Sequence, residues 1–208
     1  MEFIEAVTIE VADDSAAQPF HSAAFGLDTQ VRVRATDTAS TGFRGFTLAL
    51  TVSQPADVDS LVESALAAGA TVLKPVAKSL WGYGGVVQAP DGTIWKVATS
   101  AKKNTGPATR HIDDLVLLIG VEDMGASKRF YVGQGLTVAK SFGSKYVEFA
   151  AGNGPVKLAL YKRKALAKDV GVDADGSGSH RLVIGGADAP FTDPDGFAWE
   201  TSRLAAAS

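Results

Sequence analysis

The hydrophobic and polar positions along the first hundred residues predict short strands interspersed with two helices. Over 56–68, apolar residues spaced three and four apart form one helical face, with Pro55 before the first turn and Gly69 after the last. A second helix is expected over 13–25. Runs of β-branched and other apolar residues predict strands at 3–11, 45–52, 70–75, 84–88 and 93–99.

The second half of the chain repeats this mixture of strands and single helices. Helices are expected over 124–133 and, as a short element, over 162–169. The stretch Gly176–Ser179 is predicted to be a flexible linker because it contains only Gly and Ser. Strands are expected at 115–121, 136–141, 145–150, 156–161, 180–184 and 197–202.

The chain contains an internal repeat. Residues 7–13 (VTIEVAD) match 117–123 (LLIGVED), and 90–95 (PDGTIW) match 194–199 (PDGFAW), at nearly the same offset. A polar stretch with Gly and Pro separates the two halves. We therefore expect two related domains and a linker, at residues 1–100, 114–208 and 101–113, respectively.

Within these halves a shorter unit recurs, with the order strand, helix and three strands. It is complete over 45–99 and over 115–161, and it is abbreviated over 3–34 and 180–202. The fold class expected from this order is α+β. Tandem βαβββ modules would form curved mixed β-sheets, and the two outer modules would be trimmed.

Composition and charge exclude several classes of protein. The 208 residues include no cysteine, which excludes disulfides, cysteine nucleophiles and thiolate metal sites. With 20 basic and 23 acidic residues the net charge is −3, which does not favour nucleic-acid binding, and the basic stretch 162–168 is interpreted as a solvated helical face. No apolar run is long enough to span a membrane and no secretory signal is visible, so a cytoplasmic location is expected.

The βαβββ order, the stretch Trp81–Gly85 (WGYGG) and the two Pro-Asp-Gly-x-x-Trp turns together resemble the vicinal oxygen chelate superfamily. This superfamily includes glyoxalase I, bleomycin-resistance proteins and extradiol dioxygenases. The likeness covers nearly the whole chain and is greatest to two-domain glyoxalase-like proteins of actinobacteria. It implies paired modules whose sheets curl into an open cup around a ligand.

In the superfamily, enzymes hold a metal in this cup with an early-strand His and a late-strand Glu, and the metal binds two adjacent substrate oxygens. The early-strand positions in this chain are Ala6, Thr47, Val116 and His180, and the late-strand positions are Lys96 and Glu200. Only His180 and Glu200 keep the superfamily's ligand types, and two ligands seldom hold a catalytic metal. We therefore expect no bound metal and no cofactor.

The candidate ligand contacts are Trp81, Tyr83, Lys96 and Thr47. The Gly-rich entry around Trp81 and Tyr83 would let a flat ligand approach two aromatic rings. Lys96 would meet an anionic ligand, or instead pair with a protein acid. Trp95 and Trp199 alternate with Lys96 and Glu200, so they are predicted to face the core.

These observations leave three hypotheses about function. The first is a protein that binds a small organic molecule in a β-sheet cup without a metal. The second is a metal-dependent lyase, isomerase or dioxygenase of the glyoxalase type. The third is an interaction protein with a filled cup. The expected partner is a small molecule rather than a nucleic acid or a membrane, and assembly as a homodimer is left open.

Overall fold

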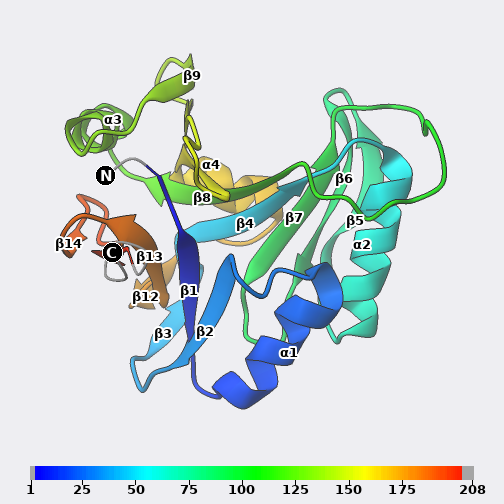
Figure 1. The fold of residues 1–208 in the computed structure, drawn as a ribbon, viewed down its shortest axis with the longest axis horizontal. Coiled ribbons are helices and arrows are strands. Elements are labelled where there is room, and N and C mark those ends of the chain that lie inside the picture. Colours follow the sequence, from blue (N-terminus) through cyan, green and yellow to red (C-terminus); the bar gives the residue numbers. More distant parts are fainter. Residues whose placement is uncertain (1–2, 203–208) are drawn as a thin grey trace.

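The computed structural model describes residues 3–202 as two large sheets with helices packed on their faces (Figure 1). The four helices are α1 (Asp14–Phe25), α2 (Pro55–Ala67), α3 (Met124–Gly133) and α4 (Arg163–Val170). In the first half, the strands are β1 (Ala6–Val11), β2 (Val31–Ala35), β3 (Ser40–Gly42), β4 (Phe46–Thr51), β5 (Thr71–Ser79), β6 (Gly82–Gln88) and β7 (Ile94–Thr99). In the second half, they are β8 (Asp114–Val121), β9 (Val138–Phe142), β10 (Tyr146–Phe149), β11 (Val156–Lys162), β12 (Gly176–Gly178), β13 (Leu182–Ala187), β14 (Phe191–Thr192) and β15 (Ala198–Thr201).

The larger sheet has eight strands in the order β5-β6-β7-β4-β8-β11-β10-β9. Its two central strands, β4 and β8, pair antiparallel, and each pairs on its other side in parallel with the last strand of its own module, β7 or β11. The two complete βαβββ modules predicted from the sequence therefore meet along one seam. The α+β class and the glyoxalase-like arrangement of mixed sheets are confirmed.

The smaller sheet repeats this arrangement with the outer, abbreviated modules. It has five strands in the order β14-β15-β13-β1-β2, and its central strands β1 and β13 again pair antiparallel. Each of the two sheets thus takes strands from both sides of the predicted linker 101–113. The division into domains at 1–100 and 114–208 stays a prediction.

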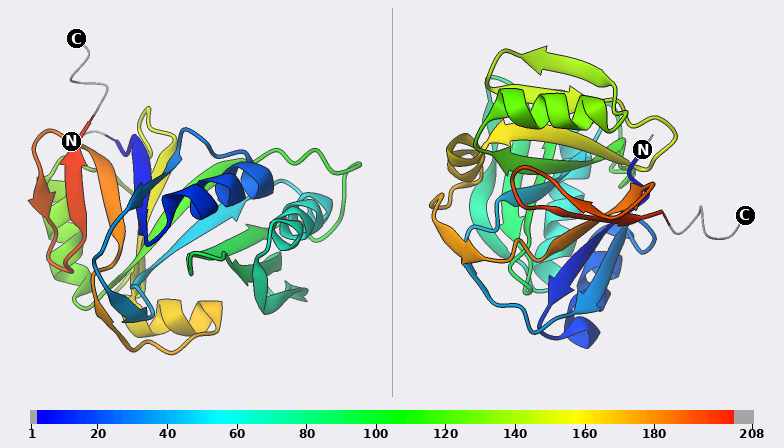
Figure 2. Two further views of the ribbon diagram at one scale, coloured as in Figure 1. Left: turned by 90° about the horizontal axis from the view of Figure 1, so that it is seen from below. Right: turned by 90° about the vertical axis from the view of Figure 1, so that its left-hand side faces the viewer.

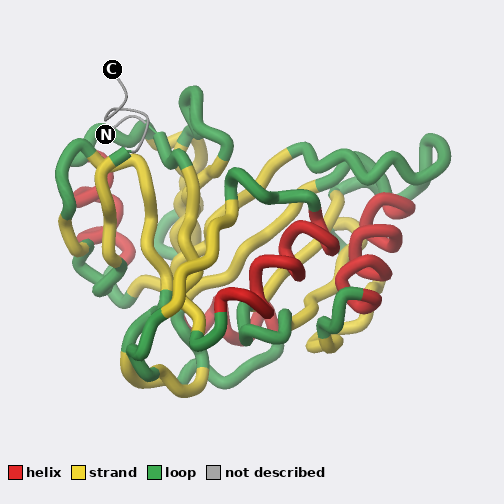
Figure 3. Tube along the Cα trace, turned by 60° about the horizontal axis from the view of Figure 1, so that its bottom comes forward, coloured by secondary structure: helices red, strands yellow, loops and turns green. Residues whose placement is uncertain are grey.

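The two faces of the eight-stranded sheet are covered differently. Helices α1 and α2 lie side by side on one face (Figure 3), and α4 lies on the other (Figure 2, left). Alternation along β7 follows this division: Trp95 belongs to the large core under α1 and α2, whereas Ile94 belongs to the cluster under α4. The face under α4 is the cup face.

The linker is fixed to the start of α2. The side-chain oxygen of Gln54 accepts hydrogen bonds from the backbone N–H groups of Thr105 and Gly106, at 2.8 and 3.1 Å. One carboxylate oxygen of Asp57 accepts from the backbone N–H groups of Thr109 and Arg110, at 2.6 and 3.0 Å. These bonds satisfy loop N–H groups and hold the chain as it passes from one module to the next.

One predicted loop is a strand. The Gly and Ser residues of Gly176–Ser179 predict a flexible linker, but β12 pairs antiparallel with β3, and Ser177 faces Thr41 across the pair. The two hydroxyl groups lie 2.8 Å apart. A Cβ at Gly176 would come within 2.2 Å of the carbonyl oxygen of Phe43, so a glycine is required for this close approach.

Trp95 is completely buried, and Trp199 is 1% exposed, which confirms the prediction that both are core residues. Trp95 packs against Phe25 and His21 of α1, with ring centroids 4.6 and 5.6 Å apart. We expect Trp95→Ala to lower the free energy of unfolding by about 3–5 kcal/mol, as removal of a large buried ring usually does. Urea denaturation followed by far-UV circular dichroism measures this loss.

Trp81 provides the control because its side chain is 84% exposed. Trp81→Ala should change the free energy of unfolding by less than about 0.5 kcal/mol. Equal losses in the two variants would contradict the assignment of Trp95 to the core.

Candidate functional site

Helix α4 and the residues after it cross the cup face of the eight-stranded sheet. Leu166, Ala167 and Val170 of α4 are buried and pack in one cluster with residues such as Val116 and Leu118 of β8. Helix α4 ends at Gly171, whose φ of 83° is the left-handed conformation that favours glycine. The centre of the cup is therefore filled by the chain itself.

The lysines of the basic stretch are exposed, as the sequence predicted, but Arg163 points inward. Its guanidinium donates to the carbonyl oxygens of Phe43 and Ala174, at 2.7 and 3.1 Å, and lies 5.2 Å from the centroid of the Phe43 ring. These contacts connect the first residue of α4 to the segment before β4 and to the segment that follows α4.

On one side of α4 lies a cavity of about 350 Å³ at the β5–β6 hairpin, which we call the hairpin cavity. Three of the four predicted ligand contacts line it: Trp81, Tyr83 and Lys96. Its lining includes glycines at positions 82, 84 and 85, which have no side chains of their own to fill it. The full lining is Lys74, Pro75, Ala77, Lys78, Ser79, Trp81, Gly82, Tyr83, Gly84, Gly85, Val86, Lys96, Ala98, Thr99 and Asp169.

Within this lining the side chains of Tyr83 and Lys96 point to opposite faces of the sheet. Lys96 pairs across the strands with Val86, which belongs to the cluster under α4. Tyr83 packs against the other core, and its hydroxyl donates to Asp59 of α2 at 2.7 Å. This bond, together with burial, raises the pKa of Tyr83. Trp81, in the turn before β6, remains the exposed ring of the cavity.

Lys96 forms an ion pair with α4. Its Nζ lies 2.6 Å from Oδ2 of Asp169, and the two side chains are 33% and 35% exposed. Lys74 binds the same end of the helix, with its Nζ 2.9 Å from the carbonyl oxygen of Lys168 and 2.6 Å from that of Asp169. Two lysines of the sheet therefore hold the last turn of α4.

The fourth candidate, Thr47, lies elsewhere. Its side chain is completely buried on β4, opposite Leu118 of β8, and it lines none of the three cavities described here. Its hydroxyl has no hydrogen-bond partner among residues 3–202. The structure therefore brings together three of the candidates and separates Thr47 from them.

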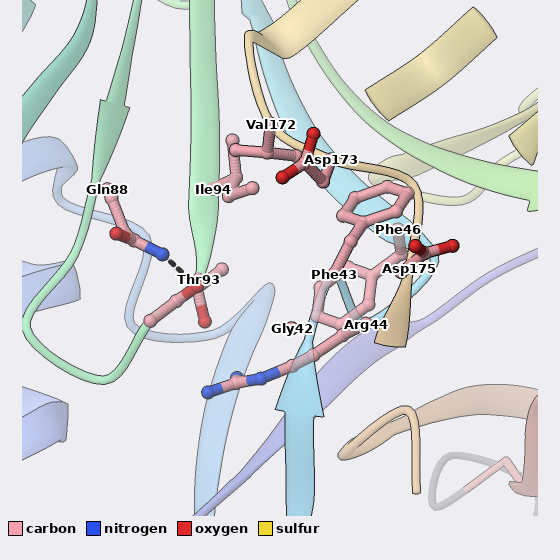
Figure 4. Close-up of a pocket in the computed structure, with 11 residues that line it drawn as sticks. Gly42, Phe43, Arg44, Phe46, Gln88, Thr93, Ile94, Val172, Asp173 and Asp175 are labelled. Carbon is pink, nitrogen blue, oxygen red and sulfur yellow. Dashed lines mark hydrogen bonds between the residues drawn. The ribbon is translucent and has the colours of Figure 1, made fainter. Parts of the chain in front are cut away.

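Sequence reasoning missed a second cavity, of about 380 Å³, on the other side of the chain that follows α4 (Figure 4). In this view Thr93 and Ile94 lie opposite Phe43, with Arg44 extended below. Its wall includes Val172 from the segment after α4, and no sequence motif indicated that this segment would reach the sheet. The sequence signal was weak because these residues come from four separate parts of the chain.

In the smaller sheet, the open face carries a cluster of charged side chains. Arg34 donates to Glu10 and to Glu200, each at 2.7 Å, and these bonds raise the pKa of Arg34 further above its usual value. His180 lies nearby, stacked on Phe197 with ring centroids 3.9 Å apart. Together with neighbouring residues, Glu10, Arg34, His180 and Glu200 line a third cavity of about 410 Å³.

Comparison with solved structures identifies this architecture. Glyoxalase I from Zea mays superposes with a TM-score of 0.62 at 16% sequence identity, over 96% of this chain and 91% of that chain. A candidate dioxygenase from Bacillus subtilis superposes with a TM-score of 0.58 at 9% identity, over 96% and 84% of the two chains. This is the vicinal oxygen chelate fold. No protein-family model and no curated protein matches the sequence.

The resemblance seen in the sequence is thus confirmed at the level of the fold. The positions that the sequence resemblance assigns to metal ligands in the large cup are Thr47, Val116 and Lys96. Thr47 and Val116 are buried, and Lys96 is an ammonium paired with Asp169. The three positions do not fit a divalent cation, because Val116 has no ligating atom and Lys96 is a cation, which leaves one hydroxyl, whereas catalytic metals are held by about three protein ligands.

The small cup also does not fit a metal. Nδ1 of His180 lies 2.6 Å from the carbonyl oxygen of Arg44, and Nε2 lies 2.9 Å from that of Asp195, so neither nitrogen directs a free lone pair into the cup. Glu200 is bound to Arg34. Within the described part of the chain, no group of three or more His, Asp or Glu side chains could hold a metal ion.

We expect the protein to bind no stoichiometric divalent metal. After dialysis against zinc or nickel and removal of free ions, elemental analysis should give far less than one metal per chain, because His180 and Glu200 are engaged with other groups. One metal per chain that disappears in both His180→Gln and Glu200→Gln would overturn this expectation.

The buried hydroxyl of Thr47 leads to a prediction about stability. Thr47→Val keeps the shape and removes an unpaired polar group, so it should raise the free energy of unfolding by about 1 kcal/mol. Thr51, on the same strand, donates to Asp114 at 3.3 Å and is the matched control. Thr51→Val should lower the free energy of unfolding by about 0.5 kcal/mol. A loss at Thr47 equal to that at Thr51 would contradict this reading.

Proposed function

We propose that this protein binds a small organic anion with a flat apolar body in the hairpin cavity, without a metal. The observation that carries the proposal is the composition of that cavity. Lys74, Lys78 and Lys96 line it with one acid, Asp169, so its charged side chains leave an excess of two positive charges. Such an excess favours anions over cations and neutral molecules.

The apolar part of the ligand follows from the same surface. The Trp81 ring is 84% exposed at the rim, and the glycines beneath it leave the sheet backbone uncovered. A flat ring could lie on this floor and stack against the indole. A volume of about 350 Å³ falls in the range of small-molecule pockets.

A catalytic role of the glyoxalase type receives less support. The fold is shared with glyoxalase I from Zea mays, but fold alone does not determine activity. At the superfamily's metal-ligand positions, Val116 has no ligating atom, and the side chains of Lys96, His180 and Glu200 are already bound to other groups. Among the described residues, no helix is long and apolar enough to cross a membrane.

The test is titration with 2-naphthoate, a flat aromatic carboxylate, followed by isothermal calorimetry. Trp81→Ala should weaken binding by roughly three- to tenfold through loss of the stacked ring. The neutral isostere 2-naphthamide should bind more weakly than 2-naphthoate because it lacks the charge. Absence of binding by 2-naphthoate, or equal binding of the two compounds, would reject the proposal.

Two matched controls separate the site from general surface effects. Phe142, on β9, is another exposed aromatic residue and lies outside the cavity, so Phe142→Ala should leave the affinity unchanged. Lys157 pairs with Asp114 at 2.7 Å with exposures of 30% and 35%, close to those of Lys96 and Asp169. Lys96→Ala should weaken binding, whereas Lys157→Ala should not.

A further inference from the structure

The last turn of α4 places a carboxylate directly on the lysine that the ligand would use. Oδ2 of Asp169 lies 2.6 Å from Nζ of Lys96, and Asp169 itself lines the hairpin cavity. A carboxylate of an anionic ligand would form the same charge-assisted hydrogen bond with the Lys96 ammonium group at this distance. Asp169 therefore occupies, within the chain, the position expected for the ligand's charged group.

The rest of α4 is held by contacts that do not involve this carboxylate. Leu166, Ala167 and Val170 are buried against the sheet, and the backbone carbonyl oxygens of Lys168 and Asp169 accept from Lys74. The side chain of Asp169 is 35% exposed. It can therefore turn into water while the helix stays in place.

We propose that Asp169 is an internal substitute for the ligand's carboxylate, and that a carboxylate ligand binds by displacing it from Lys96. This inference rests on the proposed function and names its ligand class: organic carboxylates with a flat apolar body. It also assigns Asp169 a role in setting the affinity, because the ligand must compete with a carboxylate that is always present.

The charges around Lys96 allow this exchange. The charged groups that line the cavity with Lys96 are Lys74 and Lys78 of β5 and Asp169 of α4. Lys74 is bound to two carbonyl oxygens of α4, and Lys78 pairs across the hairpin with Tyr83, whose side chain lies on the opposite face of the sheet. With the ligand bound and Asp169 turned outward, the ligand carboxylate replaces that of Asp169 at Lys96, so the number of negative charges at Lys96 is unchanged. A half-exposed ion pair is weak, and its loss can be offset by a ligand that also stacks on Trp81.

The exchange predicts that removing the internal carboxylate strengthens binding. Asp169→Asn should bind 2-naphthoate about three- to fivefold more tightly than the unmodified protein, the factor that corresponds to the usual strength of an exposed ion pair. Asp114→Asn breaks the comparable pair with Lys157 outside the cavity and should leave the affinity unchanged. In the double variant Lys96→Ala with Asp169→Asn, the gain should disappear.

A spectroscopic readout locates the exchange. In two-dimensional ¹H–¹⁵N NMR spectra of the unmodified protein, 2-naphthoate should shift the amide resonances of Asp169 and Gly84, while those of Leu166 stay in place. Simultaneous large shifts along α4 would show that the helix itself is displaced and would overturn the inference.

The outcomes distinguish this inference from the proposed function. Binding that is equal in the unmodified protein and in Asp169→Asn, or weaker in the variant, rejects the role of Asp169 and leaves the cavity as a binding site. Absence of binding in every variant rejects both. Tighter binding in Asp169→Asn that persists in the double variant also rejects the role, because Lys96 would then not be the group released.

Discussion

The antiparallel pairing of β4 with β8 is the contact on which the rest of the structure depends. It runs from Phe46 opposite Ile119 to Thr51 opposite Asp114, and it joins the two complete modules into one eight-stranded sheet. Alternation along these strands sends Leu48 and Leu117 to the core under α1 and α2, and Ala49 and Val116 to the cup. A shift of one residue would exchange these faces, so burial on both sides fixes the register.

Once that seam exists, the cup needs an occupant, because its centre is apolar. Ala49, Val116 and Leu118 would be exposed to water without α4, whose apolar residues cover them. In each of the two cups, a charged side chain of the sheet is neutralised by an ion pair. Lys96 is paired with Asp169 in the large cup, and Arg34 is paired with Glu200 in the small one. A basic side chain is thus paired with a carboxylate in each cup.

The sequence could predict the parts of this arrangement that depend on local periodicity. The alternation of Trp95 and Lys96 assigned the two residues to opposite faces correctly because β7 is a regular strand. The Gly-rich entry suggested Tyr83 as a contact beside Lys96; both line the hairpin cavity, but the Tyr83 side chain bonds to Asp59 on the other face. Which face it takes depends on the cross-strand register between β6 and β7, which cannot be read from either strand alone.

A filled cup was among the hypotheses drawn from the sequence, but the segment that fills it could not be identified there. Over 162–168 the sequence shows mainly basic residues, and the few apolar positions of α4 make a narrow stripe that by itself does not indicate its partner. The location of this stripe is set by long-range contacts, such as those of Arg163 with the carbonyl oxygen of Phe43. Likewise, His180 has the residue type of a metal ligand, and only the positions of two distant carbonyl oxygens reveal that it is engaged.

The hairpin cavity remains open for a reason that lies in its glycines. Helix α4 ends at Gly171, and its apolar face reaches the hairpin at Val86 of β6. Beyond that point the floor would have to be covered by side chains of β6, but Gly84 has none, and a Cβ there would come within 2.7 Å of the carbonyl oxygen of Val97. The backbone geometry that excludes a side chain from this position therefore also preserves the space beside Trp81 and Lys96.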